Sequence, residues 1–159
     1  MIYILLGTNL GDKLSNLRTA VAKLSSHAIT IKRTSSIYKT AAWGNTNQDY
    51  FLNQVLELET KIEPSNLLKV CIDTEIEMGR VRNEKWEARI IDIDILFYND
   101  FILNSNDLTI PHQFLHKRLF TLQPLQELNA DLEHPVFKKT ITELLKNCED
   151  NLPVEKITE

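Results

Sequence analysis

The sequence predicts an α+β fold with an antiparallel sheet, and three patterns support this class. Residues 2–6 form a short apolar run that ends at a glycine, which is typical of a buried strand. Over residues 10–24, leucine and valine recur at steps of three and four, as on a helix with one face against a core. Residues 89–98 give the strongest strand signal of the chain, with aspartate and isoleucine alternating at its centre.

The segments between these patterns complete the order of elements. Residues 29–40 are rich in β-branched types and predict one long strand, and residues 41–50 predict a loop. A further strand is expected over 52–60, followed by a helix that begins at Pro64 and ends near Gly79. Strand, helix, strand, strand, helix, strand is the ferredoxin-like βαββαβ order, with helices packed on the sheet.

Extra elements are expected after residue 100. The pattern predicts a short strand at 108–110 and helices over 119–128 and 140–147. No repeat or linker divides the chain, so we expect a single domain over residues 1–159, with a frayed tail from about residue 148.

Composition limits the classes of function. The 159 residues carry a formal net charge of -4, which argues against broad electrostatic binding of nucleic acid. No apolar run approaches the ~18 residues of a membrane span, and no basic leader precedes residue 2. Cys71 and Cys148 form neither a disulfide framework nor a metal-ligand spacing. We therefore expect a cytoplasmic protein with no membrane and no nucleic-acid partner.

Two aspartates stand at alternate positions of the segment RIIDIDILF. On a strand, Asp92 and Asp94 share one face, with Cα atoms ~6.6 Å apart. At an effective dielectric constant of ~20, their charges repel by roughly 2 to 3 kcal/mol. Mg²⁺ commonly binds through one or two carboxylates, with water and substrate phosphates completing its coordination. The pair therefore suggests a magnesium site, although an exposed face paired with lysine or arginine remains the alternative.

Glu75 occupies an unusual position on the second predicted helix. On a helical wheel it falls near the middle of the apolar face, among Leu67, Leu68, Cys71, Ile72 and Met78. A carboxylate buried there needs a donor, a cation or a ligand as partner. The alternative is a peripheral glutamate whose side chain reaches solvent from the helix end.

A basic segment, GRVRNEKWEAR, connects this helix to the aspartate strand. Arg80, Arg82, Lys85 and Arg89 surround Trp86. Arginine offers forked donors for phosphate oxygens, and tryptophan offers a flat surface for a heterocycle. A solvated surface loop is the alternative interpretation.

Two later segments add candidates for binding a nucleotide and an aromatic ring. LTIPH places His112 after a short strand, and HKRLFTLQPL places Arg118 near Phe120. Each has a structural alternative, a hydrogen-bonded histidine and a core phenylalanine. Neither GxxxxGK[ST] nor GxGxxG occurs, so an ATP site must be built without these glycine-rich loops.

Six segments, in order and spacing over about residues 3–130, resemble the hydroxymethyldihydropterin pyrophosphokinase family. They are LLGTNLGD, SSIYKTAAWGN, FLN, GRVRNEKWEARIIDIDILF, LTIPH and RLFTLQPL. The resemblance implies a ferredoxin-like fold and transfer of the β,γ-diphosphate of ATP to the hydroxymethyl group of 6-hydroxymethyl-7,8-dihydropterin, with release of AMP, in folate biosynthesis.

The resemblance also implies roles for individual residues. Asp92 and Asp94 would hold two Mg²⁺ ions, and Arg80 and Arg89 would stabilise the phosphates during transfer. The positions implied for ATP binding are Glu75, Arg82, Trp86, Ile95, Thr109, His112 and Arg118. Those implied for pterin binding are Thr40, Ala41, Ala42, Trp43, Phe51, Asn53 and Phe120.

The chain departs from the family pattern at several of these positions. Ala41 and Ala42 stand where relatives often have two prolines, and Phe51 stands where they often have tyrosine. The segment between Arg80 and Arg89 is one residue shorter, so Lys85 has no assured counterpart in the family.

Two other functions remain as alternatives. A ferredoxin-like RNA-binding module would stack bases on its sheet, but the acidic charge and the absence of an RNP-like segment disfavour it. A metal-dependent phosphotransferase for another heterocyclic alcohol would use the same residue types. For the pyrophosphokinase, ATP and the pterin are the expected partners, and we expect a monomer.

Overall fold

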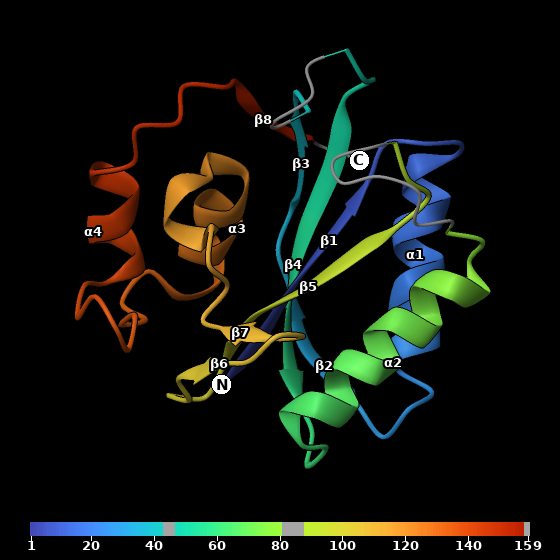
Figure 1. The fold of residues 1–159 in the computed structure, drawn as a ribbon. Helices are drawn as coiled ribbons and strands as arrows, with labels where there is room; N and C mark the ends of the chain where they lie inside the picture. Colours follow the sequence, from blue (N-terminus) through green and yellow to red (C-terminus); the bar gives the residue numbers. More distant parts are fainter. Residues whose placement is uncertain (43–46, 81–87, 158–159) are drawn as a thin grey trace.

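A computed structural model describes residues 1–42, 47–80 and 88–157, and shows one sheet between two layers of helices (Figure 1). All pairings in the sheet are antiparallel, in the order β5-β1-β4-β3-β8, and β2 pairs with β4 beside β3. Its strands are β1 (Ile2–Thr8), β2 (Thr30–Thr34), β3 (Ile37–Thr40), β4 (Phe51–Glu59), β5 (Asp92–Tyr98) and β8 (Val154–Ile157).

The helices divide between the two faces of the sheet. α1 (Lys13–Leu24) and α2 (Pro64–Glu77) cover one face, and α3 (Leu119–Asn129) and α4 (Ile141–Lys146) lie on the other (Figure 1). A 3₁₀ turn, η1 (Leu115–Lys117), precedes α3, and a hairpin of β6 (Leu103–Asn104) and β7 (Thr109–Ile110) follows β5. The first six predicted elements thus form the ferredoxin-like arrangement, with extra C-terminal elements on the second face.

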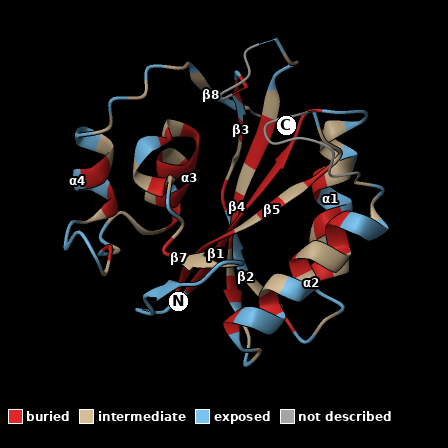
Figure 2. Ribbon diagram, viewed as in Figure 1, coloured by how far each residue is buried: buried red, intermediate tan, exposed pale blue. Residues whose placement is uncertain are grey.

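Side chains along β1 alternate between two cores, which explains why helices pack on both faces of the sheet. Ile2, Ile4 and Leu6 belong to the core beneath α1 and α2, whereas Tyr3 and Leu5 belong to the core beneath α3 and α4. Every residue of β1 is buried, as the uninterrupted red of this strand in Figure 2 shows. A strand buried on both faces carries apolar side chains at successive positions, which is why residues 2–6 are a continuous apolar run.

Local signals define the ends of the first two helices. α1 begins at Lys13 because the Asp12 side chain caps it, accepting the backbone N–H of Ser15. α2 begins at Pro64, as predicted, and Gly79 follows its end with φ of 93°, a conformation that glycine adopts without steric cost. Across the described ranges, no helix combines the length and apolar character that a membrane span requires.

The predicted strand over residues 29–40 is divided into β2 and β3. At the break, the Ser35 backbone N–H donates to the Val55 carbonyl oxygen, and the Ser35 hydroxyl accepts the Val55 N–H at 2.9 Å. A side-chain oxygen therefore replaces a backbone carbonyl in the ladder, and the chain bends there.

The predicted frayed tail is wrong for residues 154–157. They form β8, which extends the sheet by pairing with β3, with Val154 opposite Thr40. The pairing with β3 supplies the order that the polar sequence of this segment does not predict.

Candidate active site

Asp92 and Asp94 lie on the sheet face that α3 and α4 partly cover. Their neighbours Ile93 and Ile95 belong to the core beneath α1 and α2, which confirms the alternation predicted for this strand. In the sheet register, Asp94 lies opposite Leu5 and Asp92 lies opposite Gly7. The two carboxylates therefore point to the same side of the sheet, beyond the apolar core of that side.

Two arginines contact Asp92, one from each end of the basic segment predicted from the sequence. Arg80 Nη1 lies 2.6 Å from Asp92 Oδ1, and Arg89 Nη1 lies 2.9 Å from Oδ2. Both guanidinium groups are nearly buried, with 11% and 12% of their side chains exposed. Arg80 and Arg89, the two ends of the predicted basic segment, thus meet at one carboxylate.

Glu75 links α2 to the start of β5. Only 1% of this residue is exposed, and its Oε1 lies 2.8 Å from Arg80 Nη1 and accepts the Ile93 N–H at 2.7 Å. The glutamate is therefore buried and paired, in contrast to a side chain that reaches solvent. Its carboxylate positions Arg80 and holds the part of β5 that lies between the two aspartates.

Asp94 faces a histidine and a third arginine. His112 Nε2 lies 3.6 Å and Arg118 Nη1 lies 3.9 Å from Asp94 Oδ2. Burial and the negative charge of Asp92 raise the pKa of Asp94 to about 7. A bound cation would lower this pKa again, because it would offset the repulsion between the two carboxylates.

His112 and Arg118 are held by their own neighbours. The Phe114 N–H donates to His112 Nδ1 at 3.1 Å, which leaves Nε2 to carry the proton that faces Asp94. Burial lowers the pKa of His112 to about 4, so the ring is neutral at pH 7. The Arg118 guanidinium carbon lies 5.2 Å from the Phe114 ring centroid and 5.4 Å from the Phe120 ring centroid. Both aromatic rings are therefore within cation–π distance of the arginine.

The same face continues across β1 to β4 and β3. Asn53 lies opposite Gly7 in one pairing and opposite Tyr38 in the other, and Phe51 lies opposite Thr40. Asn53 is 2% exposed, and its Nδ2 has no hydrogen-bond partner among the residues that the structure describes. A buried amide of this kind is suited to a polar ligand that accepts a hydrogen bond.

A glycine separates the asparagine from the aspartate in this row. A Cβ atom at Gly7 would lie 3.1 Å from Asn53 Oδ1 and 3.7 Å from a ring carbon of Phe51. A side chain at position 7 would therefore require the Asn53 amide to shift by a few tenths of an ångström.

Comparisons with known proteins identify the family of this chain. The family model of 7,8-dihydro-6-hydroxymethylpterin-pyrophosphokinase (HPPK) matches residues 3–130. The chain belongs to this family. The 2-amino-4-hydroxy-6-hydroxymethyldihydropteridine pyrophosphokinase of Methylorubrum extorquens is 41% identical over 131 residues, which cover 82% of this chain and 83% of that protein. The enzyme of the same name from Aquifex aeolicus is 40% identical, with 89% and 88% covered.

Solved structures share the fold of this HPPK-family chain. Wild-type HPPK-DHPS of Plasmodium falciparum with pteroate has a TM-score of 0.72 at 17% identity, and the match covers 92% of this chain and 44% of that one. The chain thus spans less than half the length of the HPPK-DHPS structures that it matches.

The remaining predicted residues of this HPPK-family chain fall into three groups. Trp43, Arg82 and Trp86 lie outside the described residues. Ile95 is brought to the opposite face, where its side chain is 3% exposed in the core beneath α1 and α2. The third group lies next to strands that border the site. Ala41 is exposed and Ala42 is buried, directly after β3. Thr109 lies in β7, three residues before His112.

Sequence reasoning missed Asn9, which connects the two segments that flank the site. Asn9 Oδ1 accepts the Arg89 N–H at 2.8 Å, and Nδ2 donates to Gln48 Oε1 at 2.9 Å and to the Asp49 carbonyl oxygen at 3.3 Å. In the sequence, Asn9 follows the first apolar run and is a residue type typical of turns. Its burial, at 2% exposed, is the feature that a turn assignment does not predict.

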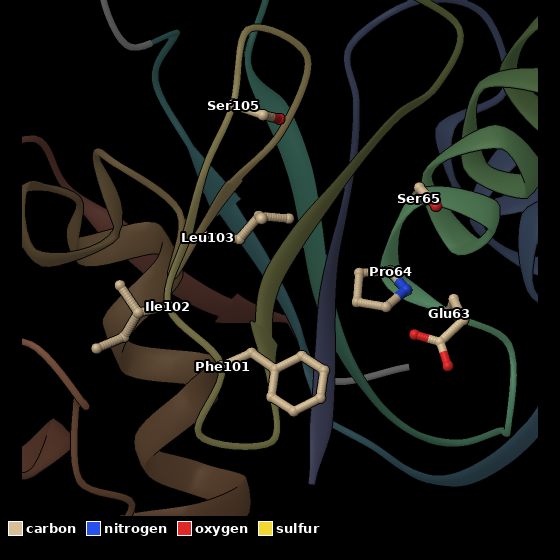
Figure 3. A pocket seen from close by; sticks show the side chains of 7 residues that line it. All are labelled: Glu63, Pro64, Ser65, Phe101, Ile102, Leu103 and Ser105. Atoms are coloured by element: carbon tan, nitrogen blue, oxygen red, sulfur yellow. The ribbon is translucent and has the colours of Figure 1, made fainter.

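A pocket of about 520 Å³ lies at the other end of β5 and includes none of the predicted site residues (Figure 3). It is lined by Glu63, Pro64 and Ser65 at the start of α2, and by Phe101, Ile102, Leu103 and Ser105 around the hairpin. β5 is seven residues long, so Asp92 at its start is roughly 20 Å from its far end. This pocket is therefore separate from the aspartate site of the HPPK-family fold.

Proposed function

We propose that this chain transfers the β,γ-diphosphate of ATP to the hydroxymethyl oxygen of 6-hydroxymethyl-7,8-dihydropterin, releasing AMP and forming the pterin diphosphate for folate biosynthesis. Membership of the HPPK family supports the reaction class. The observation that carries the proposal is the row on one sheet face, in which two aspartates with three arginines lie beside a buried asparagine amide.

Asp92 and Asp94 are the residues that would hold Mg²⁺. Among the described residues, no three His, Cys, Asp or Glu side chains gather as a metal cage. Two carboxylates at alternate positions of one strand suit Mg²⁺, which commonly takes one or two carboxylates together with substrate phosphates and water. When bound, two such ions would neutralise charge on the triphosphate and polarise the phosphoryl group under attack.

Three arginines would bind the phosphates. Arg80 and Arg89 form ion pairs with Asp92, and Arg118 lies near Asp94. All three guanidinium groups would therefore surround a triphosphate bound through metal ions to the two aspartates. Forked donors of this kind stabilise negative charge on phosphate oxygens. Neutral His112, with its Nε2 proton toward Asp94, adds a hydrogen-bond donor for ATP.

The pterin would lie over the part of the face formed by β3, β4 and the start of α3. Asn53 would hydrogen-bond the amide edge of the ring, and Phe51 and Phe120 would form its walls. Phe120 is 8% exposed and belongs mainly to the core beneath α3, so only a small part of it is available to a ligand. The proposal includes the monomeric state and the cytoplasmic location expected from the sequence.

Release of AMP from ATP with hydroxymethyldihydropterin tests this proposal, with Asp94→Ala compared to the wild type. We expect activity only with Mg²⁺, and a loss in kcat of about 10³-fold or more in the variant, because one metal ligand is removed. Asp107→Ala is the matched control, because Asp107 is an exposed carboxylate near the β6–β7 hairpin. Full activity of Asp94→Ala would contradict the metal assignment, and stabilisation of the protein by RNA in place of ATP and Mg²⁺ would favour the RNA-binding alternative.

A further inference from the structure

Helix α3 begins at the site but has no cap of its own. Its N-cap residue is Arg118, which makes no side-chain capping hydrogen bond, and Phe120 follows in the first turn. The first N–H groups of a helix have no partner within it and need an acceptor from elsewhere. Because two predicted ligand-binding residues stand at this end, whatever caps the helix also determines where they lie.

Asp150 supplies the cap from a distant part of the chain. Its Oδ2 accepts the Leu119 N–H at 3.0 Å, and its Oδ1 accepts the Leu152 N–H at 3.0 Å. Both carboxylate oxygens are therefore engaged, one by the helix and one by the segment that follows Asp150. A negative charge at a helix N-terminus is also favoured by the helix dipole.

The segment after Asp150 is attached to the sheet. Four residues later the chain enters β8, in which Val154 lies opposite Thr40 of β3 (Figure 1). β3 ends at Thr40, one of the residues implied for the pterin. Asp150 thus joins the start of α3 to the strand on the pterin side of the site.

The other end of α3 is joined to the same two strands. Glu127 accepts the Tyr38 hydroxyl at 2.5 Å and the Ser36 N–H at 2.7 Å, and Lys156 of β8 lies 3.8 Å from it. Polar contacts therefore hold α3 at both ends. Its start contacts Asp150, which precedes β8, and its other end contacts β3, the turn before β3, and Lys156 of β8. With Glu127 fixing the far end, Asp150 determines the position of the near one.

We infer that Asp150 is a positioning residue, which caps α3 and thereby holds Arg118 toward Asp94 and Phe120 at the edge of the pterin site. This inference rests on the proposed function, because its effect is defined on ATP and pterin. It assigns a role to the C-terminal segment, which lies beyond the residues that the family model matches.

Asp150→Ala is the test, with Glu143→Ala as the matched control. Glu143 caps α4, where its Oε2 accepts the Thr140 N–H at 2.8 Å, and no predicted site residue lies on that helix. Loss of either cap lowers the midpoint of urea denaturation by a similar amount. We expect only Asp150→Ala to lower kcat/KM for the pterin, by about tenfold, because small displacements of positioning groups are costly to catalysis.

Asp150→Asn gives the conservative comparison and a variant that retains the fold. Its amide oxygen still accepts one N–H, so we expect kcat/KM to recover to within about threefold of the wild type. Amide hydrogen exchange supplies a readout besides activity: exchange at residues 119–122 rises in Asp150→Ala and stays unchanged in Glu143→Ala.

Two results separate the inference from the proposed function. An active wild type with unchanged kcat/KM and unchanged exchange at residues 119–122 in Asp150→Ala would overturn the positioning role alone. A wild type that releases no AMP with the pterin would overturn the proposed function, and with it the effect assigned to Asp150.

Discussion

The two faces of the sheet differ in what their side chains contribute, and β5 takes part in both. Toward α1 and α2 it presents Ile93 and Ile95 to an apolar core. Toward the opposite side it presents Asp92 and Asp94, whose contacts in the structure are arginines and a histidine. In the proposed function, one strand therefore serves stability with one set of side chains and chemistry with the other. The two contributions are separable by mutation.

The largest effect that tests this separation is expected on the face covered by α1. Leu17 is 1% exposed in that core, and its change to alanine removes buried methyl groups and leaves a cavity. We expect Leu17→Ala to lower the free energy of unfolding by about 2–5 kcal/mol. Urea denaturation measures this loss, and kcat/KM at a temperature where the variant is folded stays within twofold of the wild type.

The matched change on the other face has the opposite pattern. Asp94→Ala removes a charge that is repelled by Asp92, so the free energy of unfolding is expected to stay the same or rise while activity is lost. The separation of roles would be wrong if Asp94→Ala and Leu17→Ala changed stability and activity in the same proportion.

The stability of the protein is expected to fall in acid because of a buried histidine on the face that α3 and α4 cover. His134 is 3% exposed against Phe97 and Phe137, and its Nδ1 accepts the N–H groups of Val136 and Phe137. Burial, with a smaller contribution from His116, lowers the pKa of His134 to about 4. The unfolded chain therefore takes up this proton first as the pH falls below about 6.5. The stability present above that pH is lost as the pH falls toward 4.

Urea denaturation at pH 7.5 and pH 5 measures this effect. From the shifted pKa, His134 is expected to account for a loss of about 2 kcal/mol between the two values. In His134→Gln that part of the pH dependence disappears, whatever the variant's stability at pH 7.5. An equal pH dependence in the two proteins would assign the acid sensitivity to other groups.

The smallest expected effect lies within the site itself. Gly7→Ala places a Cβ atom 3.1 Å from Asn53 Oδ1, so the amide must shift by a few tenths of an ångström. We expect the KM for the pterin to rise several-fold and the KM for ATP to stay unchanged, which corresponds to about 1 kcal/mol. Steady-state kinetics with each substrate varied in turn measures the difference. A rise confined to the KM for ATP would contradict the placement of Asn53 on the pterin side.

Periodicity predicted the parts of the molecule that depend on one element and one face. Asp92 and Asp94 could be assigned to one side of a strand because their isoleucine neighbours define the other side. Glu75 could be recognised as unusual because a helical wheel placed it among leucines. These patterns are local, because the direction of each side chain follows from the geometry of its own strand or helix.

Features that depend on two distant segments could not be predicted in the same way. The strand over residues 29–40 breaks because the Ser35 hydroxyl bonds to Val55 of another strand. Residues 154–157 become ordered because β3 offers them an edge, and Asn9 is buried because Arg89 and Gln48 meet there. The sequence of each segment alone carries no sign of its partner.

The hydrogen bond from Ile93 to Glu75 has a consequence for how copies of this chain meet in solution. β5 is the outermost strand of its side of the sheet, and such a strand ordinarily invites another molecule to extend the ladder. Here the Ile93 N–H is taken by a carboxylate, and the Leu96 carbonyl oxygen accepts the His112 N–H. Two backbone groups of the strand that carries the aspartates are thus unavailable to a strand of another molecule, which disfavours intermolecular β-pairing along the edge beside the candidate site.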